Sequence, residues 1–416
     1  MTTAALGTPP QPFRFCIDLV WDTLFVPNAS IHLGYGAMPG RIVRYYANES
    51  STAEPRCNLG RRSFEQNLVH FSGPVAQDTF RVMGNGSEDG GALEVANQLF
   101  VAVDKAGSDY YNLRINSDGV IGLGLSPRFH TTPPTPNSIS SFLASPWSRM
   151  VQAGTPDTNL FAIEVPRAAS DDIENVPNRS DPAMTGEISF GAISARYRGA
   201  PFAALPLVRD DDRFWAVEAR WDNRTHPLHR RSDDDDGDDD DGDADNNSGD
   251  NNASPHKKKK KKKKKKKTIA VFTTEYFIAL PDTALVQQIY RSLPMWAREE
   301  DCLHIPTYLH CAARDHLPDL VFELGGTSQS FTVTARQYAY RMKREIVPTE
   351  WYADGGEEEG GSPVPRDAVV LGSPLLNAYY GVYDLDQMEV RRESCPPTLP
   401  ISGTGETLMS QKDGPT

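Results

Sequence analysis

Hydrophobic residues recur along this chain in short runs, many of which alternate with polar residues. Clusters of Gly, Pro, Asn and Asp separate the runs, which is the pattern of β-strands joined by turns. Eleven such runs lie at 13–20, 79–84, 99–104, 119–125, 160–165, 186–193, 215–221, 268–272, 320–326, 330–335 and 368–372. Helical periodicity is best in 138–154 and in 282–297, where Leu285, Ile289 and Leu293 share one face. The pattern predicts an all-β protein with two or three short helices.

One long segment, 231–267, carries charge in place of this pattern. Residues 233–245 include ten aspartates, and 257–267 are eleven consecutive lysines. Such a composition cannot bury apolar surface, so we expect the segment to be disordered. Because strand-like sequence resumes at Thr268, the segment is predicted to be an insertion between two strands of a lobe. The lysines could also bind a polyanion or act as an import signal.

Length and charge narrow the class of protein. At 416 residues the chain is long enough for two lobes, each with its own core. Without the two charged tracts, the 43 basic residues fall to 32 and the 56 acidic residues fall to 46, a net charge of −14. An acidic surface disfavours nucleic acid and suits a secreted protein or one of an acidic compartment.

Several features bear on where the protein resides. Asn-x-Ser/Thr sequons, typical of secreted proteins, begin at the candidate glycosylation sites Asn28, Asn48, Asn85, Asn178 and Asn223, and two more lie in the charged insertion. No stretch approaches 18 consecutive apolar residues, so no membrane span is expected. The first residues also lack the charged and apolar regions of a signal peptide. Either the protein stays inside the cell or the chain starts downstream of its true beginning.

The segment LGTPPQPFRFCIDLVWDTLFVP, 6–27, resembles the first active-site strand of the pepsin-like aspartic peptidases, whose pattern is roughly iGTPPQxFxvxiDTGSSdLWVP. Further matches follow in the family's order at 45–52, 73–79, 118–126, 150–165, 186–199, 317–326 and 369–386. The resemblance implies a bilobal fold with a substrate cleft between the lobes and a β-hairpin flap from the first lobe. We expect an N-terminal lobe over 1–200, a C-terminal lobe over 201–400 and a polar tail over 401–416. The resemblance begins inside the family's first strand, which favours a truncated start.

The family's chemistry needs two carboxylates that share one proton, so that one acts as base toward water and the other as acid toward the carbonyl. Each carboxylate stands in an Asp-Thr/Ser-Gly turn. Counting back from the LFVP sequence places Asp18 on the first catalytic aspartate, followed by Leu19 and Val20 in place of Thr-Gly. Leu19 lacks the hydroxyl that locks the turn to the opposite lobe. Asp18 could instead be a structural carboxylate that accepts backbone hydrogen bonds.

The second turn falls in TIAVFTTEYFIALP, which resembles the family's aLLDSGTTlxyLP. Counting back from Leu280 and Pro281 predicts Phe272 at the second catalytic aspartate, with Thr273 and Thr274 after it. A phenylalanine can neither carry a proton nor bind one. A competing alignment would use Asp22 and Asp282 as the dyad, although Asp282 stands at a predicted helix start, where capping is the natural role.

The remaining candidates concern the flap and the cysteines. The flap tyrosine of the family falls on Gln66, and no glycine remains at the predicted tip. Of the five cysteines at least one must lack a partner within the chain. A disulfide between Cys302 and Cys311 is expected in a secretory lineage, and their spacing with the nearby histidines matches no usual zinc pattern. Cys16 is expected to be a small buried hydrophobe.

The sequence therefore predicts a non-catalytic pepsin-like homologue with a cleft of the peptide-binding type. The alternatives are an active aspartic endopeptidase working through Asp18 and an unexpected second carboxylate, and polyanion binding through the lysines. We expect a monomer of the secretory pathway or extracellular space, with a peptide or protein as its partner. No cofactor, metal, specific nucleic acid or membrane span is expected.

Overall fold

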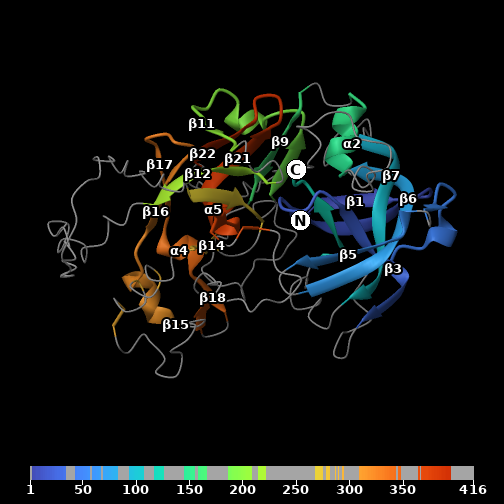
Figure 1. Cartoon of the computed structure of the whole chain (residues 1–416), viewed down its shortest axis with the longest axis horizontal. Coiled ribbons are helices and arrows are strands. Elements are labelled where there is room, and N and C mark those ends of the chain that lie inside the picture. The colour runs from blue at the N-terminus through green and yellow to red at the C-terminus, as the bar shows by residue number, and fades with distance from the viewer. Residues whose placement is uncertain are drawn as a thin grey trace, which may run out of the picture.

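The computed structural model places N-terminal and C-terminal strands in two separate groups, with a further sheet between them (Figure 1). The structure describes residues 2–33, 43–56, 59–66, 69–82, 93–106, 117–125, 145–154, 158–165, 186–208, 214–221, 268–274, 278–281, 286, 289, 293–294, 309–342, 345–347, 364–365 and 367–394. Within these ranges strands dominate, and helices are few and short. The predicted all-β, bilobal, pepsin-like fold is confirmed.

The first lobe is an eight-stranded sheet with the order β1-β2-β8-β3-β7-β6-β4, and β5 pairs with β6. Its strands are β1 (Thr2–Leu6), β2 (Gln11–Asp18), β3 (Leu24–Leu33), β4 (Glu54–Pro55), β5 (Arg61–Gln66), β6 (Val69–Val82), β7 (Leu93–Ala106) and β8 (Gly119–Gly122). Because β1 pairs with both β2 and β6, the sheet closes on itself. Along β2, Phe13 and Phe15 are buried while Arg14 between them is exposed, which is the alternation expected of a strand with one face on the core.

The middle sheet combines strands from both halves of the chain in the order β10-β9-β21-β22-β11. Its strands are β9 (Leu160–Glu164), β10 (Glu187–Phe190), β11 (Ala203–Pro206), β21 (Tyr379–Asp384) and β22 (Glu389–Ser394). β9 pairs with β21, so the end of the chain returns beside a strand that precedes it by more than 200 residues. The rings of Phe161 and Tyr383 stack at 4.8 Å across this junction.

The second lobe contains a six-stranded sheet, β14-β20-β13-β12-β16-β17, and a three-stranded sheet, β15-β19-β18. Its strands are β12 (Ala216–Trp221), β13 (Thr268–Phe272), β14 (Ile278–Ala279), β15 (Leu309–His310), β16 (Leu320–Leu324), β17 (Ser330–Val333), β18 (Tyr340–Met342), β19 (Glu345–Val347) and β20 (Val369–Leu371). Each lobe has a parallel strand pair next to its candidate turn, β2 with β8 and β13 with β20.

The helical elements are α2 (Pro146–Gln152), α4 (Ala335–Tyr338), α5 (Ser373–Ala378) and the 3-10 turns η2 (Ala47–Glu49), η7 (Ala195–Tyr197) and η11 (Cys311–His316). In α2 the Ser145 side chain caps the first turn by accepting a hydrogen bond from the Ser148 N–H at 3.1 Å. The described part of the predicted helix 282–297 includes helical residues at 286 and 289. Over the described ranges, no helix has the length and apolar character needed to cross a membrane.

The main hydrophobic cluster runs through both lobes and the middle sheet. Trp215, fully buried, links them further because its indole N–H donates to the carbonyl oxygen of Leu123 at 2.8 Å. A second cluster lies within the first lobe around Phe25 and Val120, and the half-buried Cys16 packs against it. Cys16 thus behaves as a small hydrophobe, although it is less buried than the sequence predicts.

Strands β12 and β13, which flank the charged insertion, pair antiparallel with Ala219 opposite Thr268. The residues between them therefore connect adjacent strands of one sheet. Residues 231–267 themselves lie outside the described residues.

We expect that replacing 231–267 with a short Gly/Ser turn leaves the melting temperature nearly unchanged. The two strands already meet through their own backbone pairing, and loop-closure entropy changes by only about 0.6 kcal/mol for each doubling of loop length. Differential scanning calorimetry of both proteins measures this, and affinity for a polyanion such as heparin should disappear with the segment. A fall of many degrees would show that the tract packs on the folded body.

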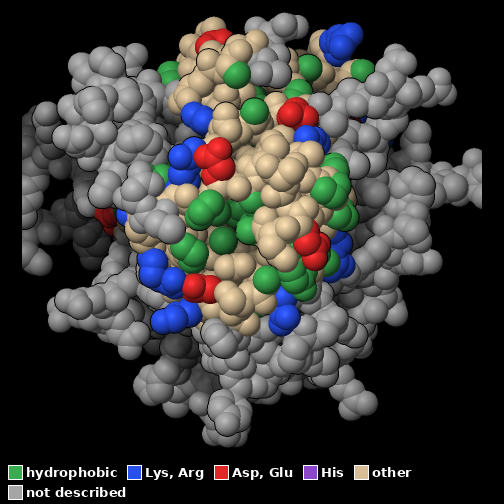
Figure 2. Space-filling model, turned by 90° about the vertical axis from the view of Figure 1, so that its right-hand side faces the viewer, with side chains coloured by type: hydrophobic (Ala, Val, Ile, Leu, Met, Phe, Trp, Pro, Cys, Tyr) green, Lys and Arg blue, Asp and Glu red, His purple; other side chains and the backbone are tan. Residues whose placement is uncertain are grey.

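Two candidate glycosylation sites lie in the described ranges. Asn48 is exposed in η2, and Asn28 is half-buried in β3. Asn85, Asn178 and Asn223 lie outside the described residues, as do Cys302 and the tail 401–416. On the face shown in Figure 2, basic and acidic side chains are interspersed around a small hydrophobic group.

Candidate functional site

The first candidate turn follows β2, which ends at Asp18. The Asp18 side chain is 2% exposed, and its Oδ1 accepts hydrogen bonds from the backbone N–H groups of Val20 at 2.7 Å and Trp21 at 2.9 Å. The turn is therefore built around the carboxylate. This is the structural arrangement that the sequence left open for Asp18.

The strand beside this turn needs glycine at two positions. Asp18 pairs with Gly122 in the parallel ladder of β2 and β8. A Cβ added to Gly122 would lie 2.4 Å from the Thr23 nitrogen, and one added to Gly124 would lie 2.4 Å from the Val20 oxygen. Because any side chain would collide with the turn's backbone, the two glycines let the turn pack directly on the chain after β8.

The parallel ladder of the first lobe recurs at the end of β13. Phe272 pairs with Leu371 in the parallel ladder of β13 and β20, as Ile17 pairs with Ile121 in the first lobe. Continued by one residue, this register puts Thr273 opposite Gly372, as Asp18 is opposite Gly122. The Thr273 N–H donates to the Leu371 oxygen at 3.0 Å. The strand register therefore makes Thr273 the counterpart of Asp18.

A side-chain hydrogen bond joins the two turns. The Thr274 Oγ1 hydroxyl donates to the carbonyl oxygen of Ile17, the residue before Asp18, at 2.7 Å. On the other side, Ser373 Oγ donates to the Thr274 carbonyl oxygen at 3.0 Å. In the first turn the position that corresponds to Thr274 is Leu19, whose side chain has no hydroxyl and is completely buried. The Thr274 hydroxyl thus makes one of the two hydrogen bonds that could join the turns symmetrically. The apolar Leu19 side chain stands where the second hydroxyl would be.

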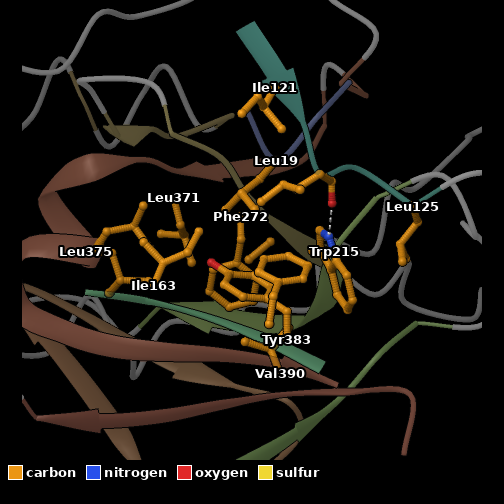
Figure 3. Packing of buried hydrophobic residues seen from close by; sticks show 14 of the residues in the cluster. Leu19, Ile121, Leu125, Ile163, Trp215, Phe272, Leu371, Leu375, Tyr383 and Val390 are labelled. Atoms are coloured by element: carbon orange, nitrogen blue, oxygen red, sulfur yellow. Dashed lines mark hydrogen bonds between the residues drawn. The ribbon is translucent and has the colours of Figure 1, made fainter. Parts of the chain in front are cut away.

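The predicted placement of Phe272 at the second catalytic position differs from the structure by one residue. Phe272 is fully buried in the main hydrophobic cluster, where its ring meets Tyr383 edge to face at 6.4 Å (Figure 3). The Arg392 guanidinium carbon lies 4.4 Å from the centre of the same ring. The strand alternation explains the difference, because Ala270 and Phe272 face the main cluster while Val271 faces a smaller one. In the strand register, Thr273 and not Phe272 is thus the counterpart of Asp18.

The two other predicted elements are placed as follows. β5 and β6 form a hairpin in which Gln66 pairs with Val69, so Gln66 stands next to the turn of this hairpin; its place in a flap stays a prediction. In the competing alignment, Asp22 accepts a hydrogen bond from the Thr23 hydroxyl at 3.1 Å just before β3, and Asp282 lies outside the described residues. Asp18, and not Asp22, is the residue that pairs with Gly122.

With this geometry in place, comparison with known proteins gives the family context. Vacuolar protease A of Arthroderma otae is 23% identical over 383 residues, which cover 92% of this chain and 74% of that protein. Vacuolar protease A of Aspergillus fumigatus is 24% identical over 390 residues, with coverage of 92% and 75%. The similarity supports a relationship to the pepsin-like aspartic peptidases. No family model matches the chain.

Two features of the site were missed from the sequence. The role of Thr273 had a signal, because Val120-Ile121-Gly122 and Val370-Leu371-Gly372 repeat the same pattern and fix where each turn begins. Arg392 had no such signal, since a basic residue in a strand near the chain's end usually faces solvent. Its burial depends on neighbours that only the fold brings together.

Thr274→Val is expected to lower the free energy of unfolding by about 1 kcal/mol, because it removes the hydroxyl that bonds Ile17 at nearly constant volume. Urea denaturation followed by tryptophan fluorescence measures the change. Thr274→Ser keeps the hydroxyl and is the matched control, which should lose less. Equal stability of the wild type and the valine variant would show that the bond contributes nothing to the junction of the lobes.

Proposed function

We propose that this chain is a pepsin-like aspartic peptidase homologue that has lost peptide-bond hydrolysis and binds peptide or protein in the cleft between its lobes. The proposal depends on one observation, the strand register, which makes Thr273 the counterpart of Asp18, where hydrolysis would need a second carboxylate. Leu19 and Val20, which stand after Asp18 in place of the family's Thr-Gly, support the same conclusion.

The chemistry of the dyad explains why this substitution matters. Hydrolysis by a carboxylate pair requires one group that accepts a proton from water and one that gives a proton to the carbonyl. A threonine hydroxyl does not ionise in the acid range, so it can neither take a proton from water as a carboxylate does nor give its own proton to the carbonyl. Asp18 alone could orient a water molecule but could not divide the two roles. Leu19 and Val20 compound the loss, because the first lacks the locking hydroxyl and the second adds a β-branched side chain in the turn.

The scaffold of a binding protein is retained. The β5–β6 hairpin stands where the family resemblance places the flap, and Thr274 still joins the two lobes. The related proteins are named as vacuolar proteases, which supports a place in the secretory pathway. Exposed Asn48 is the better supported acceptor for an N-linked glycan, and a monomer is the proposed state.

An active aspartic endopeptidase is the alternative, favoured by the names of the related proteins. It requires a second carboxylate close enough to Asp18 to share a proton. The register assigns that place to a threonine, so the non-catalytic function is the better supported of the two.

Peptide binding and cleavage can be followed in one experiment. A fluorescent pepstatin-like peptide and a fluorescent substrate peptide are titrated with the protein at acid pH, and binding is read by anisotropy. We expect both to bind and the substrate peptide to remain intact by chromatography after prolonged incubation. Cleaved substrate peptide would overturn the proposed loss of hydrolysis. If neither peptide binds, the proposed peptide-binding cleft is overturned.

A further inference from the structure

An exposed turn of the first lobe carries one of the sequons. Asn48, Glu49 and Ser50 spell Asn-x-Ser, and Asn48 is exposed in the 3-10 turn η2. The other sequon of the described ranges begins at Asn28, which is half-buried in β3 and forms an isolated bridge with Tyr45. A glycan is bulky and hydrophilic, so the exposed turn accommodates one without disturbing a strand.

A tyrosine ring stands in solvent two residues before this asparagine. Tyr46 is 39% exposed and, with Val43, makes up the exposed large hydrophobic residues of the described ranges. One side chain holds its backbone on both sides, because the Tyr46 N–H donates to Gln11 Oε1 at 2.9 Å and the Tyr46 carbonyl oxygen accepts from Gln11 Nε2 at 2.8 Å. These two hydrogen bonds fix the backbone from which the ring projects.

This ring offers an apolar partner to a sugar on Asn48. Successive Cα atoms are about 3.8 Å apart, so the Cα atoms of Tyr46 and Asn48 are at most about 7.6 Å apart and the first sugar can reach the ring. The C–H groups on one face of a hexose carry partial positive charge, whereas the face of an aromatic ring is negative. Packing the two faces together also removes apolar surface of the ring from water.

The hydroxyl of the same sequon is already used in the folded protein. Ser50 Oγ accepts a hydrogen bond from the Thr8 N–H at 2.9 Å and shares a further bond with the Thr52 hydroxyl at 3.3 Å. A transferase that recognises Asn-x-Ser needs this hydroxyl as well. The folded turn and the transferase therefore compete for one group.

We propose that Asn48 receives an N-linked glycan during synthesis, before Ser50 bonds to Thr8, and that the first N-acetylhexosamine packs on the ring of Tyr46. The donor is an oligosaccharide carried on a lipid pyrophosphate. The transfer forms a bond between the Asn48 side-chain nitrogen and the anomeric carbon, breaks the bond from that carbon to the pyrophosphate, and passes one amide proton to the departing pyrophosphate. The inference depends on the secretory location proposed above and is independent of peptide binding in the cleft.

The first test locates the glycan. The full chain is produced behind a cleavable secretion signal in a eukaryotic host, so the result does not depend on where the natural protein resides. Enzymatic release of glycans in water labelled with heavy oxygen converts each modified asparagine to a labelled aspartate, which peptide mass spectrometry detects. We expect the label at position 48, its loss in Asn48→Gln, and its retention in Ser50→Thr, which keeps the hydroxyl.

An unlabelled Asn48 in this secreted chain would overturn the proposal. A label that is present here but absent from protein isolated from its natural host would instead contradict the proposed location. The same chain refolded from a host without the transferase should stay unmodified at Asn48 when it is incubated with transferase and donor. Modification of that folded chain would contradict the proposed order of events.

The second test measures the contact with Tyr46 through melting temperatures of the secreted proteins. We expect the glycosylated wild type to melt at a higher temperature than Asn48→Gln. Tyr46→Ala should remove most of this difference, and the matched variant Tyr46→Phe should keep it, because residues in contact are energetically coupled. In the unglycosylated refolded proteins, positions 46 and 48 should act independently. A stabilisation by the glycan that Tyr46→Ala leaves unchanged would overturn the packing of the sugar on this ring.

Discussion

Asp18→Ala is expected to lower the free energy of unfolding by about 2–6 kcal/mol, because it leaves two backbone N–H groups of the turn without their acceptor and each orphaned donor costs about 1–3 kcal/mol. The side chain is nearly inaccessible, so water cannot easily replace the carboxylate. Guanidinium denaturation of the purified protein measures the loss.

Asp18→Asn is the informative control. Its amide oxygen can still accept from Val20 and Trp21, so it should lose only about 1 kcal/mol, the difference between a charge-assisted and a neutral hydrogen bond. The pair separates a structural carboxylate from a catalytic one. If the alanine variant is as stable as the wild type, the turn does not depend on Asp18.

The second large effect concerns rebuilding the catalytic pair. Neither Thr273→Asp nor Phe272→Asp alone should give cleavage, because groups that act as a unit are non-additive. Thr273→Asp combined with Leu19→Thr, Val20→Gly and Glu275→Gly restores both turns in the register that the structure shows. This four-substitution variant should cleave a denatured protein at acid pH, whereas Thr273→Asp alone should show no cleavage.

The control for this variant keeps the three turn substitutions and moves the carboxylate to position 272. It should be inactive and less stable, since it replaces a buried aromatic ring beside Arg392 by a short acid. Replacing a buried Phe by a small residue costs about 3–5 kcal/mol. Proteolysis by the control variant with the carboxylate at position 272, or by Thr273→Asp alone, would contradict the assigned register.

Much of the fold follows from local pattern. The predicted strands at 13–20 and 268–272 became β2 and β13 within two residues, because alternation and turn residues mark strands wherever one face is buried. The sequence predicted neither the closure of the first lobe by β1 nor the joining of both halves of the chain in the middle sheet. No local signal specifies which distant strands pair.

The candidate site was predictable to within one residue. Counting back from Leu280 and Pro281 assumes that the stretch after the turn has the family's length, whereas the parallel ladder fixes the turn independently of that length. Continued by one residue, the ladder puts Thr273 opposite Gly372, and the hydrogen bond from Thr274 to Ile17 agrees with this register. The burial of Arg392 depends on Gly381, Phe272 and Tyr383 meeting in space, which sequence spacing alone does not reveal.

The most direct measurement of lost catalysis is a proteolysis assay of the wild-type chain on a denatured protein at acid pH, with and without a pepstatin-like inhibitor. Asp18→Asn serves as the matched protein, since it keeps the turn's hydrogen bonds while removing the carboxylate. We predict no cleavage that the inhibitor blocks and no difference between the wild type and Asp18→Asn. Cleavage that the inhibitor abolishes and that Asp18→Asn lacks would show that a second carboxylate completes the site, and would contradict the loss of catalysis proposed here.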